Sequence, residues 1–146
     1  MHDIGDNYLA AEPHLLDVAK SVAGFRQVCS TNDLAEVEER SQVTPACHVI
    51  YFGDSVPDIV QGGTYSHVTQ TWLLIIVVRQ GRGQNPNREA GELIKQLLLA
   101  LHGNNLVDGK HVLTRINSPA KPRYTKGHAY YPLAFNVKFR LKGDRT

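Results

Sequence analysis

The most regular pattern in the chain is helical and begins at Asn85-Pro86. Apolar residues recur three and four positions apart, at Ala90, Leu93, Ile94, Leu97, Leu98 and Leu101. The opposite side carries Glu89, Glu92, Lys95 and Gln96. This spacing predicts an amphipathic helix that ends near His102 and Gly103 and packs its apolar side against the rest of the fold.

Two segments have the pattern of long strands. Residues 64–79 are rich in β-branched and aromatic side chains, and residues 72–78 are apolar at every position, which predicts a central strand covered on both faces. Residues 131–141 alternate strictly, which predicts a strand with one exposed face. The inward positions are Tyr131, Leu133, Phe135, Val137, Phe139 and Leu141, and the outward ones are Lys138, Arg140 and Lys142.

The remaining pattern predicts shorter elements. They are a helix at about 13–23, a strand at 25–29, a capped helix from Asn32 to near Arg40, a strand at 46–52 ending at Gly53-Asp54, and a strand at 112–116. Residues 55–63 and 117–130 have no period and are expected to be loops. The order predicts an α+β fold of a single domain over 1–146, with a mixed, largely antiparallel sheet packed with two main helices.

The overall charge of +2 hides an uneven distribution along the chain. Residues 1–73 contain 3 Lys or Arg and 10 Asp or Glu, a net charge of −7. Residues 74–146 contain 13 Lys or Arg and 4 Asp or Glu, a net charge of +9. The two halves either interleave in one sheet or form an acidic and a basic face that attracts further copies or a polyanion.

No pattern predicts a membrane protein. The first residues lack the basic and apolar regions of a secretory signal, and no apolar run approaches the ~20 residues of a membrane span. A cytosolic protein is therefore expected.

The glycine turn between the strand predicted over residues 64–79 and the long helix is the most enzyme-like feature. Gly81-Arg82-Gly83 resembles part of a phosphate-binding loop, but a dinucleotide fingerprint needs a third glycine where Pro86 stands, and a Gly-Lys-Ser/Thr sequence is absent. A tight turn is the simpler interpretation. Arg82 and Arg88 are then candidate contacts for an acidic partner.

Cysteine and histidine spacing does not predict a metal centre. Cys29 and Cys47 are too far apart for a Cys-x-x-Cys motif and are expected to be buried, reduced thiols. The seven histidines occur singly, so a metal site would have to be assembled from separate strands, for instance by His48 and His67. No catalytic residue, metal ligand or cofactor is predicted.

Residues 117–130 form a basic segment that contains Lys121, Arg123, Lys126 and His128 around one aromatic residue, Tyr124. A loop of this length in a compact domain is usually functional or mobile, and its composition permits binding to nucleic acid or to an acidic protein. A solvated hairpin tip is the alternative. The candidate interface residues are Arg82, Arg88, Lys121, Arg123, Tyr124 and Lys126.

Four stretches resemble the phage tail terminator-like proteins, including the small neck and tail proteins of Mu-like prophages. They are Leu9-Ala10-Ala11-Glu12, residues 45–53 (PACHVIYFG), residues 72–79 leading into 88–101, and residues 131–135 (YPLAF). Together they cover most of the chain.

The resemblance implies a tail terminator-like α+β subunit of a ring, commonly six-fold, at the end of the tail tube. The implied role is tail termination or completion, or head–tail connection, and the implied partners are further copies, tail-tube and head-connector proteins, and DNA passing through the ring. It implies no catalysis, no cofactor and no membrane, with assembly in the host bacterial cytoplasm and a final place in the virion tail or neck. The alternatives are a small metal- or nucleotide-dependent enzyme and a basic nucleic-acid-binding module.

Overall fold

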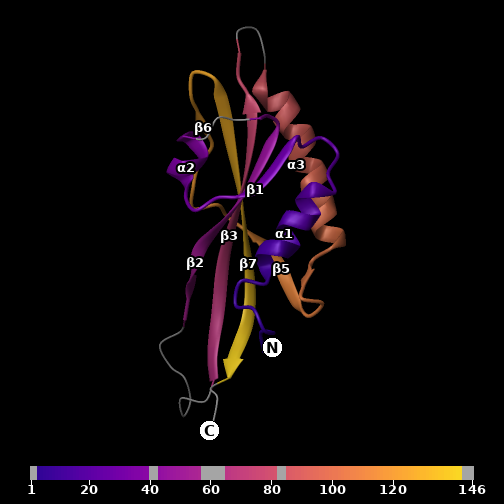
Figure 1. Ribbon diagram of the computed structural model, residues 1–146, viewed down its shortest axis with the longest axis vertical. Helices are drawn as coiled ribbons and strands as arrows, with labels where there is room; N and C mark the ends of the chain where they lie inside the picture. Colours follow the sequence, from indigo (N-terminus) through magenta and orange to yellow (C-terminus); the bar gives the residue numbers. More distant parts are fainter. Residues whose placement is uncertain (1–2, 40–42, 57–64, 82–84, 143–146) are drawn as a thin grey trace.

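A computed structural model describes residues 3–39, 43–56, 65–81 and 85–142 of the protein (Figure 1). The elements in these ranges are α1 (Ala11–Lys20), β1 (Gln27–Ser30), α2 (Leu34–Glu39), β2 (Ala46–Ser55), β3 (Tyr65–Arg79), α3 (Pro86–Gly103), β4 (Leu106–Val107), β5 (His111–Ile116), β6 (Arg123–Tyr124) and β7 (His128–Lys142).

One mixed sheet organises the fold. Its described strands lie in the order β1-β2-β3-β7-β5-β4, and β6 pairs with β7 beside this path. Only β1 and β2 run parallel among these pairs, and β3 and β7 pair along all 15 residues of each strand. The predicted α+β fold with a mixed, largely antiparallel sheet is therefore confirmed.

The sheet has two unequally covered faces. The first face, on which Trp72 and Leu74 lie, packs against α1 and α3 in the larger hydrophobic core. The second face, on which Leu73 and Ile75 lie, carries a smaller core that includes Val37 of α2. Figure 1 shows α1 and α3 on one side of the sheet and α2 on the other. The apolar run of β3 is buried because it lies between these layers.

Helix α3 matches its sequence pattern closely. Its first turn is capped by Asn85, whose side-chain Oδ1 accepts a hydrogen bond from the backbone N–H of Asn87 at 3.1 Å, and Pro86 takes the first helical position. Ala90, Leu93, Leu97 and Leu101 are buried. Of the other predicted apolar positions, Ile94 and Leu98 are half-buried at the margin of the core.

Strand β2 does not end at Gly53-Asp54, as the sequence suggested. Tyr51 pairs with Trp72 and Gly53 with Thr71, so Phe52 is an extra residue in a β-bulge, and pairing continues to Ser55. Gly53 has a φ of +130°, a conformation that a residue with a side chain rarely adopts. The glycine therefore permits a bulge here rather than ending the strand.

The predicted loop over residues 117–130 contains a short hairpin. Strand β6 pairs with the start of β7, which begins at His128 rather than at Tyr131. The turn is held by a bond from the backbone N–H of Thr125 to the carbonyl of His128, at 2.9 Å. A second 2.9 Å bond, from the N–H of Gln80 to the carbonyl of Gly127, ties the turn to the end of β3. Neither bond depends on the hydrophobic pattern, which is why the pattern did not predict strand β6, although a hairpin tip was the alternative interpretation of this segment.

The predicted alternation of buried and exposed residues along β7 is only partly correct. Five of the six predicted inward residues are buried, but Leu141 is 43% exposed. It pairs with Ser66 beyond Phe139, whose ring is covered by Tyr8 in an edge-to-face contact at 5.2 Å between ring centroids. The outward positions differ as well, since Tyr130 and Ala134 are buried in the smaller core. Coverage of this strand thus changes along its length.

Candidate interface site

The β6–β7 hairpin places two predicted interface residues on opposite faces of the sheet. Arg123 pairs with Tyr130, which belongs to the second-face core, whereas Tyr124 pairs with Ala129, which belongs to the first-face core. Side chains of paired strand residues share a face. The basic segment is therefore two surfaces rather than one.

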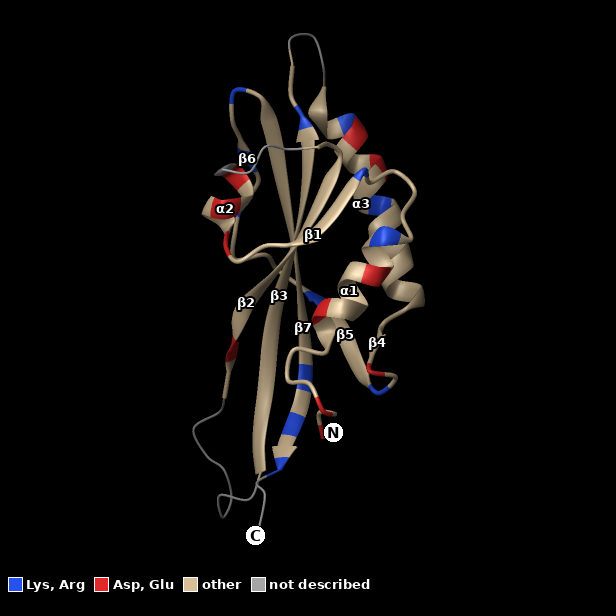
Figure 2. Cartoon of the chain, viewed as in Figure 1, with Lys and Arg blue, Asp and Glu red and all other residues tan. Residues whose placement is uncertain are grey.

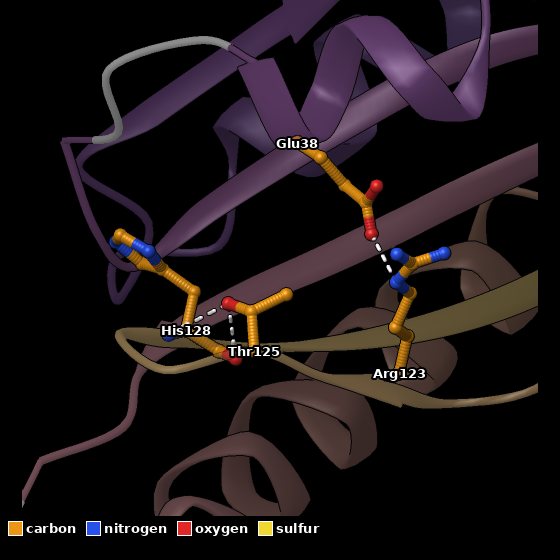
Figure 3. A network of polar contacts seen from close by, with 4 residues as sticks. All are labelled: Glu38, Arg123, Thr125 and His128. Atoms are coloured by element: carbon orange, nitrogen blue, oxygen red, sulfur yellow. Dashed lines mark hydrogen bonds and ion pairs between the residues drawn. The ribbon is translucent and has the colours of Figure 1, made fainter.

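On the second face, Arg123 is joined to α2. Its Nε lies 2.5 Å from Oε1 of Glu38, as Figure 3 shows. The Arg123 side chain is 69% exposed, so water and salt screen this ion pair and it contributes little to stability. Its effect is to hold the guanidinium beside the helix and to neutralise part of the local charge.

The hairpin tip is closed by the polar contacts of Thr125 and His128 (Figure 3). The Thr125 hydroxyl donates to the carbonyl oxygen of His128 at 3.2 Å, and the N–H of His128 donates to the same hydroxyl oxygen at 3.3 Å. The Gln80 side-chain amide donates to the carbonyl of Thr125 at 3.1 Å. Lys126 is consequently presented, exposed, on a turn with a defined geometry.

On the first face, Tyr131 links Tyr124 to Asn87, the neighbour of Arg88. The rings of Tyr124 and Tyr131 meet edge to face with centroids 5.9 Å apart, and the Tyr131 hydroxyl donates to the side-chain oxygen of Asn87. Burial, followed by the contact with Tyr124, raises the pKa of Tyr131 to about 12, so this hydroxyl stays a donor at neutral pH. Arg88 follows Asn87 on the exposed side of the first turn of α3.

A cavity of about 330 Å³ lies beside the second-face part of the hairpin. Its walls come from α2, β3, β7 and the segment before β6, and they include Leu34, Val37, Ile75, Tyr130 and Pro132, with Lys121 and Arg123 also contributing. The sequence analysis did not identify this cavity. The apolar residues of the short, acidic helix α2 were the available signal, but nothing in the pattern showed that the helix would lie opposite residues 120–123.

The phage tail terminator protein family matches residues 4–146 of the chain. The chain belongs to this family. Among curated proteins, none matches it.

Membership of the tail terminator family gives the chain a role in phage tail assembly and a place in the virion tail. The family consists of structural assembly proteins that interact with other tail and head proteins. Among the described residues, no helix has both the length and the apolar character needed to cross a membrane.

The two histidines considered for a metal site in this tail terminator chain lie far apart. His48 pairs with Ile75 on β3, whereas His67 is eight positions away on the same strand, or about 27 Å at the usual rise per residue. His48 and His67 are therefore too far apart to form the metal site that was considered as an alternative. Within residues 3–39, 43–56, 65–81 and 85–142, no group of three or more His, Cys, Asp or Glu is placed to hold a metal ion.

The cysteines differ from each other. Cys47 is fully buried, and burial raises the pKa of its thiol above the usual range. Cys29 is only half-buried, so the expectation of burial is correct for Cys47 alone. Cys29 Sγ lies 3.2 Å from Nδ1 of His48, to which Thr31 Oγ1 also lies close, at 2.7 Å. Neither cysteine forms a disulfide with a described residue.

The remaining predicted residues lie at the glycine turn. Arg82 and Gly83 fall outside the described residues, so the tight turn and the contact of Arg82 with an acidic partner stay predictions. Of the six candidate interface residues, Lys121 and Arg123 are brought together at the cavity, and Tyr124 and Arg88 lie on the other face of the sheet.

Charge is organised along the second face of the tail terminator fold rather than between two faces of the molecule. The acidic residues of α2 lie at one end, and basic residues of β7 lie at the other (Figure 2). The acidic group is Glu36 and Glu38 of α2 together with Asp33 just before the helix, and the basic group is Lys138, Arg140 and Lys142. In the sheet, strands β1 and β2 of the acidic first half lie on one side of β3, and strands β7, β5 and β4 of the basic second half lie on the other.

Proposed function

We propose that the chain is a subunit of a ring that caps the head-proximal end of the phage tail tube and joins the tail to the head. The observation that carries this proposal is the family match over residues 4–146. The ring, its six-fold symmetry and the head–tail connection go beyond what membership of the family establishes. We further propose that the protein works by assembly alone, without catalysis, and that it assembles in the host bacterial cytoplasm.

The distribution of charge supports contacts between different surfaces of neighbouring copies. An acidic group at one end of a face and a basic group at the other end attract the complementary ends of further copies. Contacts between two different surfaces are heterologous, and they close into a ring when the rotation between subunits permits.

The β6–β7 hairpin is proposed to dock on the tail tube or the head connector. Lys121, Arg123 and Lys126 supply the positive charge, and Tyr124 supplies an exposed aromatic ring on the other face. The backbone bonds that hold the turn reduce the conformational entropy lost on docking. Arg88 and Arg82 complete the set of interface residues proposed from the sequence.

DNA that passes through the ring is a further proposed partner. The row of Lys138, Arg140 and Lys142 lies on an open part of the second face, beside polar residues of β3. Such a row contacts phosphates without reading bases, and its binding would weaken steeply with salt.

Sedimentation of the protein with its tail-tube subunit, at low and high salt, tests the proposal. We expect a multimer of defined size with the tube subunit, with weaker association at high salt because exposed charges are screened beyond ~10 Å at 0.1 M. The triple variant Lys121→Ala, Arg123→Ala, Lys126→Ala should keep its fold and bind the tube less tightly. Lys126→Ala alone should weaken tube binding in the same direction, and it does not alter the cavity lined by Lys121 and Arg123. A protein that stays monomeric and does not bind the tube subunit under any of these conditions would refute the proposal.

A further inference from the structure

We propose that the exposed end of β2 in one copy inserts into the cavity beside α2 in a second copy, with Phe52 entering the apolar space and Asp54 facing Lys121. This contact rests on the ring proposed above, for which it supplies the surfaces. It assigns the bulge in β2 and the cavity to one interface between copies of this chain.

The end of β2 at and beyond the bulge, residues 52–56, carries exposed apolar side chains that can be buried in another copy. We call this segment the insert. Phe52 is 48% exposed and Val56 is 49% exposed, and the exposed Asp54 lies between them. Burying apolar side chains of this size favours association, and a buried aromatic residue is a common energetic anchor of an interface. Two exposed apolar residues on either side of a carboxylate therefore fit a pocket with apolar walls and a lysine beside them.

This end of β2 is also accessible. Strand β1 pairs with β2 only from Ala46 to Val49, so no other described strand borders the outer edge of β2 beyond Val49. Figure 1 shows the lower part of β2 running away from all three helices. An incoming surface can therefore reach it without moving another element of the described fold.

The carboxylate of Asp54 is held in place from its own chain. It accepts a hydrogen bond from the Tyr8 hydroxyl, and burial together with this bond raises the pKa of Tyr8 to about 12. The hydroxyl therefore remains a donor at neutral pH. A carboxylate accepts several hydrogen bonds, so the Tyr8 contact leaves capacity for a cation from another copy.

The cavity supplies the complementary chemistry. Leu34, Val37, Ile75 and Pro132 provide apolar walls around about 330 Å³, and Leu34 is 39% exposed. Lys121 is exposed and forms no ion pair with the residues that the structure describes. Its ammonium group is thus available to a carboxylate.

The two surfaces carry opposite charges where they meet. The insert carries Asp54, and the cavity carries Lys121, Arg123 and Glu38, of which Arg123 and Glu38 pair with each other and leave Lys121 to face the insert. Because the surfaces differ, the contact is heterologous, and each copy can use its insert and its cavity at the same time. This is the property that a closed ring needs.

Two single variants remove the two sides of the contact. Phe52→Ser removes the insert, and Ala35→Trp fills the mouth of the cavity from an exposed position on α2. We expect each to weaken self-association at least tenfold in sedimentation equilibrium, because each removes the central apolar anchor. The matched control is Leu99→Ser, which removes a 62% exposed leucine of α3 and should leave association unchanged. Circular dichroism spectra and melting temperatures should match wild type for all three.

Mixing the two variants tests the heterologous geometry. The Phe52→Ser copy keeps its cavity and the Ala35→Trp copy keeps its insert, so an equimolar mixture should form dimers and nothing larger, whereas each variant alone stays monomeric.

A charge exchange gives a second test that does not rely on removing apolar residues. Asp54→Lys and Lys121→Glu should each weaken association, and the double variant should recover it. Lys95→Glu, at an exposed site on α3, is the matched control.

The outcomes separate this contact from the ring itself. If wild type forms multimers and the variants form them equally well, the contact is wrong and the ring stands. If the mixture forms long oligomers, the insert and the cavity do not meet. If wild type fails to self-associate at all concentrations, alone and with the tube subunit, both the contact and the ring are overturned.

Discussion

The two ends of the β3–β7 pair differ in how many layers cover them. At the covered end, residues 72–79 of β3 and 128–135 of β7 lie between α1 and α3 on the first face and the α2 region on the second. At the open end, residues 65–71 and 136–142 are covered on the first face by the N-terminal segment, where the Gln70 amide donates to the carbonyl of Tyr8 at 2.8 Å.

The second face of the open end is polar. Its positions are Tyr65, His67, Thr69, Thr71, Asn136, Lys138, Arg140 and Lys142. Thus one pair of strands changes from core to surface along its length, and the side-chain pattern changes with it. The lesson is that a strand's pattern reports local coverage rather than a property of the whole strand.

Removing a core leucine at the covered end should produce the largest loss of stability. It would show that packing at this end provides much of the free energy of unfolding. Leu97 of α3 is fully buried on the first face, and Leu97→Ala leaves a cavity, so it should lower the free energy of unfolding by about 2–5 kcal/mol. Denaturant titration measures this loss. Leu99→Ala on the same helix is the control and should change stability by less than about 0.5 kcal/mol. Equal effects of the two substitutions would mean that the orientation of α3 is wrong.

Substitution of Gly53 should have the next largest effect, at the open end. Gly53→Ala forces a side chain onto a backbone with a φ of +130°, so it should cost about 1–3 kcal/mol of stability. No atom lies within 4 Å of the added methyl group, so the cost comes from the backbone alone. The control is Gly127→Ala, because Gly127 has no positive φ and no atom lies within 4 Å of a methyl group added there. The difference between the melting temperatures of the two variants measures the cost of the backbone conformation at Gly53. If the two alanine variants melt together, the bulge geometry is incorrect.

The Tyr8 hydroxyl, which lies in the N-terminal segment that covers the open end, should contribute about 1 kcal/mol to the free energy of unfolding. Its pKa is raised to about 12 in the folded protein, above the usual value near 10. The folded state therefore holds this proton more tightly, and the contribution is fully present below pH 10 and is lost as the pH rises towards 12. The stability difference between wild type and Tyr8→Phe should narrow over that range. A difference that stays constant from pH 9 to pH 12 would contradict the contact with Asp54.

The smallest effect is expected on the open second face. Lys138 is exposed and faces solvent beside Thr69, so Lys138→Ala should change the free energy of unfolding by less than about 0.5 kcal/mol. A loss above 1 kcal/mol in denaturant titration would mean that this face is covered, and the comparison between the two ends would fail.

The elements with a strong period were predictable from the sequence. The apolar run of residues 72–78 predicted a strand covered on both faces, and it is buried at each position because helices cover both sides. The spacing of Leu93, Leu97 and Leu101 predicted α3 and its buried side. In both cases a single physical cause, the burial of apolar side chains, determines the structure.

Elements determined by backbone hydrogen bonds were missed. Strands β4 and β6 have two residues each, too few to show a period, and their positions depend on turns. Gly53 was interpreted as a strand end, although a glycine equally permits a bulge. The cavity was beyond sequence reasoning because it forms between α2 and residues 120–123, which lie about 80 positions apart in the chain.

The most direct test of the proposed function is to observe where the protein binds on purified tail tubes by electron microscopy. The chain would carry a gold label on a cysteine introduced at Lys95, an exposed position of α3 outside the proposed interfaces, in a background with Cys29→Ser. The account predicts label at the head-proximal end of each tube only, in rings with the symmetry of the tube. The account would be contradicted if the label were found along the tube walls or at both ends, or if no label were bound to the tubes.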